Sequence, residues 1–198
     1  MRIVVAITGA SGTLYGVRLV LRAAGLGATV DLVVSKAAEQ VARTELDHGL
    51  NPAEGRFREL LGDLAGQVRR FDVNDVGAEP ASGSAPIDGM VIVPCSMGTI
   101  ARIAAGLSET LIERAADVTM KEGRPLVLVP RETPLNRIHL QNLTRLLDAG
   151  ATLLPAMPGF YTRPKSIEEL VDGVVDRALA CFFGSRAVRA RWNPEADA

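Results

Sequence analysis

The stretch Ile3-Val4-Val5-Ala6-Ile7-Thr8-Gly9-Ala10-Ser11-Gly12, residues 3–12, decides the fold of this chain. Its first half is an unbroken apolar run about as long as one strand. A strand that is apolar on both faces is typical of a parallel sheet covered by helices on both sides. The second half is a tight Gly/Ser turn into a helix, so the stretch predicts the first β–α unit of an α/β protein.

Further apolar runs alternate with amphipathic stretches, one of which carries Leu135, Leu140, Leu143 and Leu147 at helical spacing. Strands are expected at residues 3–7, 30–34, 68–73, 90–93, 126–129 and 152–154. Strands that alternate with helices predict a three-layer, doubly wound parallel sheet. We expect one domain over residues 1–198, in which 186–198 form a C-terminal tail that includes Trp192.

The composition narrows the class of protein. A net charge of −1 gives no electrostatic argument for nucleic acid or an anionic membrane as partner. Cys95 and Cys181 are too few for a disulfide framework and are expected to be reduced. The first apolar run is too short for a signal peptide, and no run approaches the length of a membrane span. These features predict a cytoplasmic protein.

The segments just after the strands are where a doubly wound sheet binds its ligands. The turn Thr8–Gly12 presents backbone N–H groups and a helix dipole that can hold a phosphate, with the Ser11 hydroxyl beside them. Its glycines do not follow the dinucleotide pattern GxGxxG. The alternative is an ordinary turn in which Ser11 or Thr13 caps the helix.

Two further strand ends carry small polar residues. Ser35 follows the second strand and is expected to cap a helix, a role compatible with a ligand contact. Residues 94–99, Pro-Cys-Ser-Met-Gly-Thr, would let a planar ring or a phosphate approach the backbone closely. A nucleophilic Cys95 is not favoured, because neither His48 nor His139 is placed by the sequence to act as its base.

Charged residues emerge directly from the strand at residues 126–129. The segment Pro130-Arg131-Glu132-Thr133-Pro134 predicts a helix with Thr133 as N-cap and Pro134 at its first position. Arg131 and Glu132 would then lie at the ligand-binding edge of the sheet. The alternative is a surface ion pair.

The helix expected at about residues 107–122 carries one polar stripe, formed by Thr110, Arg114, Asp117 and Lys121. Solvated ion pairs are the simple interpretation of such a stripe. The apolar residues around it favour a functional interpretation, because they leave little of this helix for water.

The last long helix begins with the capping box Ser166–Glu169. Arg177 shares a helix face with Leu170, Val174 and Cys181, and a guanidinium among apolar groups needs an anion. An internal Asp or a ligand phosphate could supply it. The Pro-rich segment 155–164 presents Tyr161, either as a core aromatic or as a hydroxyl donor to the same anion.

Taken together, these segments resemble the flavin prenyltransferase family, the UbiX family of bacterial ubiquinone synthesis. The resemblance runs from the turn Thr8–Gly12 to Arg177, and the motifs occur in order along nearly the whole chain. Its most specific stretches are Pro94–Thr99, Arg114–Val118, Arg131–Pro134 and Pro158–Tyr161.

The resemblance implies a flavodoxin-like or Rossmann-like fold and a homododecamer built from trimers, with sites between subunits. It implies that FMN contacts Gly9, Ala10, Ser11, Ser35, Ser96, Met97, Gly98, Thr99, Arg114 and Arg131. Dimethylallyl phosphate would be held by Lys121, Tyr161 and Arg177, with Arg131 nearby. The implied catalytic residues are Ser11, Lys121, Arg131, Glu132, Tyr161 and Arg177, with Glu132 as acid/base.

The implied reaction joins a dimethylallyl group to N5 and C6 of reduced FMN, and the prenylated FMN serves a UbiD-type decarboxylase. The chain has no Asp-rich magnesium box, so cationic side chains would stabilise the leaving phosphate without a metal. Val76 stands where some relatives carry Trp. The alternatives are an FMN-dependent cysteine decarboxylase of the same superfamily, a non-catalytic FMN carrier and a purely structural α/β subunit.

Overall fold

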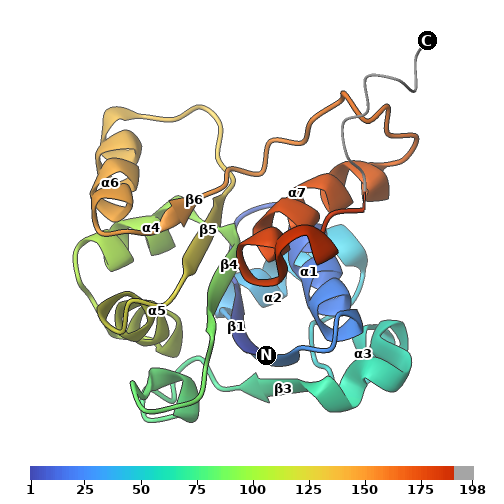
Figure 1. Ribbon diagram of the computed structural model, residues 1–198, viewed down its shortest axis with the longest axis horizontal. Coiled ribbons are helices and arrows are strands. Elements are labelled where there is room, and N and C mark those ends of the chain that lie inside the picture. Colours follow the sequence, from blue (N-terminus) through green and yellow to red (C-terminus); the bar gives the residue numbers. More distant parts are fainter. Residues whose placement is uncertain (190–198) are drawn as a thin grey trace.

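A computed structural model describes residues 1–189, and its centre is a six-stranded parallel sheet (Figure 1). All the expected strands are confirmed, and their order in the sheet is β3-β2-β1-β4-β5-β6. This is the strand order of Rossmann folds, in which the topology switches direction between β1 and β4. The strands are β1 (Arg2–Ile7), β2 (Thr29–Val34), β3 (Val68–Phe71), β4 (Gly89–Cys95), β5 (Leu126–Pro130) and β6 (Thr152–Leu153).

Helices cover both faces of the sheet, so two helical layers and the sheet make the expected three layers. One face is covered by α1 (Thr13–Gly25), α2 (Lys36–Leu46), α3 (Gly55–Leu61) and α7 (Ile167–Phe183). The other is covered by α4 (Met97–Ala104), α5 (Leu111–Lys121) and α6 (Arg137–Asp148). Short 3₁₀ turns lie at η1 (Gly62–Gln67), η2 (Glu79–Ala81) and η3 (Gly184–Arg186).

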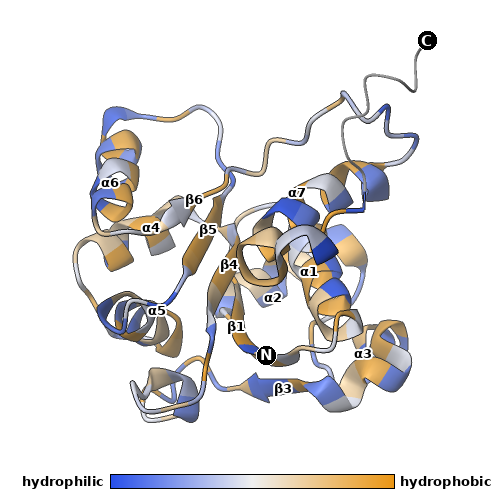
Figure 2. Cartoon of the chain, viewed as in Figure 1, coloured by the Kyte–Doolittle hydropathy of each residue, from blue (hydrophilic) through white to orange (hydrophobic). Residues whose placement is uncertain are grey.

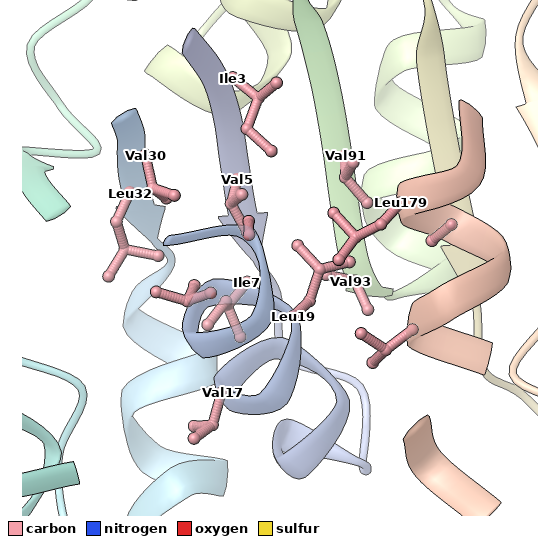
Figure 3. Close-up of a cluster of buried hydrophobic side chains, with 14 of the residues drawn as sticks. Ile3, Val5, Ile7, Val17, Leu19, Val30, Leu32, Val91, Val93 and Leu179 are labelled. Carbon is pink, nitrogen blue, oxygen red and sulfur yellow. The ribbon is translucent and has the colours of Figure 1, made fainter. Parts of the chain in front are cut away.

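Alternation along the strands divides the core between the two faces. Ile3, Val5 and Ile7 of β1 point into the cluster under α1 and α7, whereas Val4 and Ala6 point into the other. Figure 3 shows Ile3, Val5 and Ile7 on the same side of the sheet as Leu19 of α1 and Leu179 of α7. Strands β4 and β5 are coloured mainly as hydrophobic in Figure 2, because both of their faces are buried.

Two expected helix starts were wrong by several residues. The helix expected from about residue 107 begins at Leu111, because Glu113 Oε2 accepts from Thr110 N at 3.0 Å and closes its first turn. The helix expected from Pro134 begins at Arg137. Asn136 is its N-cap, and its side-chain oxygen accepts from His139 N at 2.8 Å.

The first residues of the expected tail are docked on the body of the protein. Arg189 donates from Nη2 to Asp176 Oδ1 at 2.7 Å and from Nη1 to Asp172 Oδ2 at 2.8 Å. Asp172 also pairs with Arg18, so α1, α7 and this segment share one charged cluster. Trp192 lies outside the described residues.

A second charged cluster ties the N-terminal edge of the sheet together. Asp31 is fully buried on β2 and accepts from Arg2 Nε at 2.8 Å and Arg69 Nη2 at 2.8 Å. Glu79 of η2 accepts from Arg69 at 3.3 Å and also pairs with Arg2. The pKa of Glu79 is lowered to about 2, chiefly by the hydrogen bond from Arg2. The cluster therefore fixes the start of β1, β3 and the loop before β4.

Asp31→Asn is expected to lower the free energy of unfolding by about 2–4 kcal/mol, because it leaves two guanidinium groups without their buried carboxylate. Urea unfolding monitored by circular dichroism measures this difference. The exposed Asp63→Asn is the control, and we expect its effect to stay within about 0.5 kcal/mol. A change at Asp31 as small as the control's would contradict this account of the cluster.

Residues 1–189 contain no helix that is both long and apolar enough to cross a membrane.

Candidate active site

The turn after β1 does not leave its helix N-terminus free for a phosphate. Glu45 of α2 reaches across and accepts from Gly12 N at 3.0 Å and Thr13 N at 2.8 Å. Burial raises the pKa of Glu45, but bonds from Ser11 and from these two N–H groups outweigh it and leave the pKa lowered. The expected cap is wrong, because the N-cap of α1 is Gly12 and neither Ser11 nor Thr13 makes a side-chain cap bond. In this structure the Glu45 carboxylate takes the N–H groups of Gly12 and Thr13, and a ligand contact of Gly9, Ala10 and Ser11 stays a prediction.

The same turn packs tightly against its neighbours. Gly9 lies so close to α2 that an added Cβ would come within 2.5 Å of Ala37 Cβ. Gly12 has a φ of 102°, which favours glycine. Ser35 is the N-cap of α2 as expected and accepts from Ala38 N at 3.1 Å. The turn after β1 and the start of α2 thus form one closely packed surface, which we call the ledge. It lies at the C-terminal edge of the sheet, where the strands end.

Ser96 and Thr99 lie across the switch point from that ledge. Ser96 is the N-cap of α4, and its backbone N–H donates to Thr8 Oγ1 at 2.8 Å. Thr8 Oγ1 donates in turn to Pro94 O at 2.9 Å. These bonds join the turns after β1 and β4, so the Ser11 and Ser96 segments flank the place where doubly wound sheets bind ligands.

Arg131 and Glu132 follow β5 at the same edge. Arg131 N donates to Cys95 O at 3.3 Å, and the Arg131 charge acts on Tyr15 in the first turn of α1. Burial raises the pKa of Tyr15, and Arg131 partly opposes that rise. Glu132 is exposed, and its Oε1 accepts from Thr133 N at 2.9 Å. The structure thus gathers Gly9–Ser11, Ser35, Ser96–Thr99, Arg131 and Glu132 at the C-terminal edge.

Lys121 lies at the opposite edge. It is the last residue of α5, which leads into the start of β5, whereas Arg131 follows the end of β5. The length of that strand puts them roughly 15 Å or more apart. The Lys121 ammonium pairs with Glu122 and lies beside the Gly83 loop, where an added Cβ would come within 3.0 Å of Nζ. One copy of the chain does not bring Lys121 to Arg131.

Tyr161 lies on an extended arm, which runs out from β6 before α7 begins (Figure 1). Its side chain is 65% exposed, and those of Met157 and Phe160 on the same arm are each 71% exposed. The interpretation of Tyr161 as a core aromatic was therefore wrong for a single copy.

Arg177 is exposed as well, on the outer side of α7. The argument that it is buried among apolar groups and needs an anion was wrong. Of the residues expected on its helix face, Val174 is buried and Cys181 is exposed. Arg177 is instead a cation available on the surface of the chain.

Arg114 pairs with Asp117 at 3.3 Å, and both side chains are about half exposed. The expected stripe is thus formed in part, since Thr110 caps α5 and Lys121 pairs elsewhere. Leu111 N donates to Val73 O at 2.8 Å, so α5 begins beside the segment after β3. Arg114 lies in the first turns of α5, at the end of the helix far from Lys121.

Cys95 is fully buried, and burial raises the pKa of its thiol. It is a poor nucleophile for that reason. Cys95 and Cys181 are both free thiols. Within the described part of the chain, no group of three or more His, Cys, Asp and Glu side chains could hold a metal ion.

Two open hollows lie near the site but do not contain it. One, of about 420 Å³, is lined by residues after β2 and β3, among them Lys36 and Asn74. The other, of about 640 Å³, lies beyond it between α2 and α3. Neither is lined by Ser11, Ser96 or Arg131.

The donor set at this edge fits FMN. A flavin offers ring carbonyl acceptors and a phosphate, and hydroxyls, backbone N–H groups and a guanidinium are suitable partners for both. Ser11, Ser35, Ser96 and Arg131 provide these groups around one switch point, and Thr99 supports Ser96 from behind, with its Oγ1 3.0 Å from Ser96 Oγ.

The sequence analysis missed Glu45 and Tyr15. Glu45 is the penultimate residue of α2, and no local motif marks it. Tyr15 lies three residues beyond the turn after β1 and is half-buried beside Arg131. Counting along α2 from its N-cap Ser35 puts Glu45 near the far end of the helix. Its contact with the turn after β1 depends on how α2 packs against that turn, which the sequence does not show.

Comparisons with known proteins agree with this geometry. The Flavoprotein family model matches residues 1–179, so the class of protein is a flavoprotein. The chain is 48% identical to the flavin prenyltransferase UbiX of Pseudomonas aeruginosa, over 98% of this chain and 95% of the relative. It therefore belongs to the flavin prenyltransferase UbiX family.

Two solved structures share the fold at high coverage. AnUbiX (PadA1), crystallised with FMN and dimethylallyl pyrophosphate, has a TM-score of 0.87 and 42% identity, with 97% of each chain covered. A dodecameric FMN-dependent UbiX-like decarboxylase from Escherichia coli O157:H7 has a TM-score of 0.82 and 38% identity, with 92% of this chain and 95% of that chain covered.

Proposed function

We propose that this chain is a flavin prenyltransferase that joins the dimethylallyl group of dimethylallyl phosphate to N5 and C6 of reduced FMN. The observation that carries the proposal is the donor-lined switch point between β1 and β4, with Arg131 and Glu132 beside it, in a chain of this family. An FMN-dependent cysteine decarboxylase or a non-catalytic flavin carrier would need the flavin donors but not the cations described next.

FMN would be held by Gly9, Ala10, Ser11, Ser35, Ser96, Met97, Gly98, Thr99, Arg114 and Arg131. When bound and reduced, FMN supplies the nucleophilic N5 and C6 atoms. The chain's part is to fix the ring against the ledge formed by the turn after β1 and the start of α2. Ser96 and Thr99 then hold it from the other side of the switch point.

Lys121, Arg131, Tyr161 and Arg177 form the proposed phosphate clamp. Each supplies an N–H or O–H donor to the leaving phosphate, and three of them are cations. Such donors stabilise the negative charge that develops as the allylic C–O bond breaks. The exposure of Tyr161 and Arg177 leaves both available to a ligand. No metal is needed in this mechanism, because the side chains supply the positive charge.

Glu132 is the proposed acid/base. Forming the second bond removes a proton from the ring carbon C6 and adds one to the prenyl double bond, and the exposed carboxyl group of Glu132 at the C-terminal edge would accept the first and deliver the second. Glu45 holds Ser11 and the turn in place from α2.

The site is completed by neighbouring copies in a homododecamer with sites between subunits. Lys121 lies at the N-terminal edge of its own chain, and Tyr161 stands on an exposed arm. Both observations support donation to another copy. Residues 1–198 act as one domain in this assembly, and the prenylated FMN is passed to a UbiD-type decarboxylase.

We place the protein in the cytoplasm, where its two free thiols stay reduced.

The direct test is anaerobic incubation of the protein with reduced FMN and dimethylallyl phosphate, followed by mass spectrometry of the flavin. We expect the flavin to gain one prenyl unit. Tight FMN binding with an unchanged flavin would support a carrier instead. The same assay with added EDTA tests the metal-free mechanism, and its rate is expected to stay the same.

A further inference from the structure

A chain of hydrogen bonds links a buried carboxylate to Ser96 at the C-terminal edge of the sheet. Glu113 of α5 has a side chain only 1% exposed and pairs with Arg102 of α4. Arg102 Nη2 donates to Thr99 Oγ1 at 3.3 Å, and Thr99 Oγ1 lies 3.0 Å from Ser96 Oγ. Ser96 Oγ also accepts from Thr99 N at 3.3 Å. None of these contacts involves Lys121, Arg131, Tyr161 or Arg177.

The position of Arg102 is itself fixed. Glu113 uses its other oxygen to accept from Glu109 N at 2.9 Å and Thr110 N at 3.0 Å. The carboxylate therefore cannot rotate without breaking the start of α5. Its bond to Arg102 Nε leaves Nη2 of the same planar guanidinium aimed at Thr99.

The direction of the Ser96–Thr99 bond follows from burial and charge. Thr99 is 3% exposed, and within residues 1–189 its hydroxyl hydrogen has no acceptor other than Ser96 Oγ. If Ser96 donated to Thr99, that buried hydrogen would be left unpaired, which is unfavourable. The Arg102 cation on the Thr99 oxygen further favours Thr99 as the donor, because a chain of bonds in one direction polarises its members.

Ser96 then has both acceptor positions used, one by Thr99 N and one by the Thr99 hydroxyl. Its own hydrogen is left over, and Ser96 is only partly buried at the C-terminal edge, whereas Thr99 is 3% exposed. We propose that Arg102, held by Glu113, positions the Thr99 and Ser96 hydroxyls so that Ser96 offers a hydrogen-bond donor to an acceptor atom of FMN. This inference rests on the proposed FMN site and adds a positioning residue to it.

The test compares FMN affinity and the FMN absorption spectrum in four proteins: wild type, Arg102→Met, Thr99→Val and the double variant. Arg102→Met is expected to raise the FMN dissociation constant about five- to tenfold and to shift the bound flavin's absorption bands. In the Thr99→Val background, Arg102→Met is expected to change neither, because Arg102 acts through Thr99. In the Thr99→Ser background, which keeps the hydroxyl, Arg102→Met is expected to raise the FMN dissociation constant again.

Arg56→Met is the matched control, because Arg56 is an exposed arginine in an ion pair with Glu59, far along the chain on α3. Thermal unfolding of each variant shows whether it is folded. Equal effects of Arg102→Met in both backgrounds would mean that Arg102 attracts the anionic ligand by charge alone and would overturn the inference. Unchanged FMN affinity in Arg102→Met would overturn it too.

The two proposals fail in different ways. If wild type binds FMN but leaves it unprenylated, the proposed function falls, while the affinity comparison still decides the role of Arg102. If wild type prenylates FMN and Arg102→Met binds it normally, the role of Arg102 falls and the proposed function stands.

Discussion

Mixed oligomers of Lys121→Met and Arg131→Met chains are expected to regain prenyl transfer that neither variant shows alone. Each variant by itself lacks one cation in every site, and we expect its rate to fall about 10²–10³-fold. Lys121 and Arg131 lie at opposite edges of the same sheet, so a site that uses both takes them from different copies. A mixed assembly can therefore contain sites in which both cations are intact.

The size of the recovery is set by random assembly. In an equal mixture, half the chains carry Lys121 and half carry Arg131, so about a quarter of the sites receive both. The two variants are unfolded together, refolded as a mixture and assayed by mass spectrometry of the flavin. Unmixed samples treated in the same way are the controls.

A site built from one copy gives a different result. Every chain of the mixture lacks one of the two cations, so no intact site would form and activity would stay at the level of the single variants. That outcome would overturn the proposed clamp, whichever copies touch in the assembly.

The fold followed from the sequence because it depends on local patterns. The apolar runs at residues 3–7 and 126–129 have no polar face, and this alone requires cover on both sides. The strand-end segments near Ser96 and Arg131 then fall at one edge by the geometry of parallel strands. The helix starts were less certain, because Asn136 and Thr133 both suit a cap and the sequence does not rank them.

The site was harder to predict because its residues depend on packing between elements. Glu45 reaches the turn after β1 from the last part of α2, more than thirty positions away in the chain. Arg177 looked buried because its neighbours at helical spacing are apolar, yet α7 turns that position outward. Helical spacing gives a shared face but does not say which face meets the sheet.

Two glutamates at the C-terminal edge allow a direct comparison of roles. Glu132→Gln is expected to lower kcat about 10²–10⁴-fold while FMN binding is kept, because the amide cannot accept the proton. Glu45→Gln is expected to lower the rate less, because Glu45 is already committed to Ser11, Gly12 and Thr13. Both substitutions keep the shape of the side chain, so the difference reports on charge and proton transfer. Single-turnover rates and FMN titrations of the two variants measure it.

Glu45→Gln should show its effect in stability, with a pH dependence of known sign. The folded-state pKa of Glu45 is lowered from 4.5, so its ionised form stabilises the fold above that value. At neutral pH the loss of charge at the start of α1 is expected to lower the free energy of unfolding by about 1 kcal/mol. This deficit should shrink as the pH falls below 4.5, because wild type then gains the proton as well.

The two variants therefore separate a carboxylate that moves a proton from one that holds a turn. A carboxylate whose pKa is lowered is a weaker base, and general-base catalysis favours a pKa near the working pH. The lowered pKa of Glu45 therefore argues against Glu45 as the base, and the exposed position of the Glu132 carboxylate at the C-terminal edge makes Glu132 the proposed base. If Glu45→Gln stopped transfer at unchanged stability while Glu132→Gln stayed active, the roles would be reversed, and the hydrogen bonds at the start of α1 would have to open during the reaction.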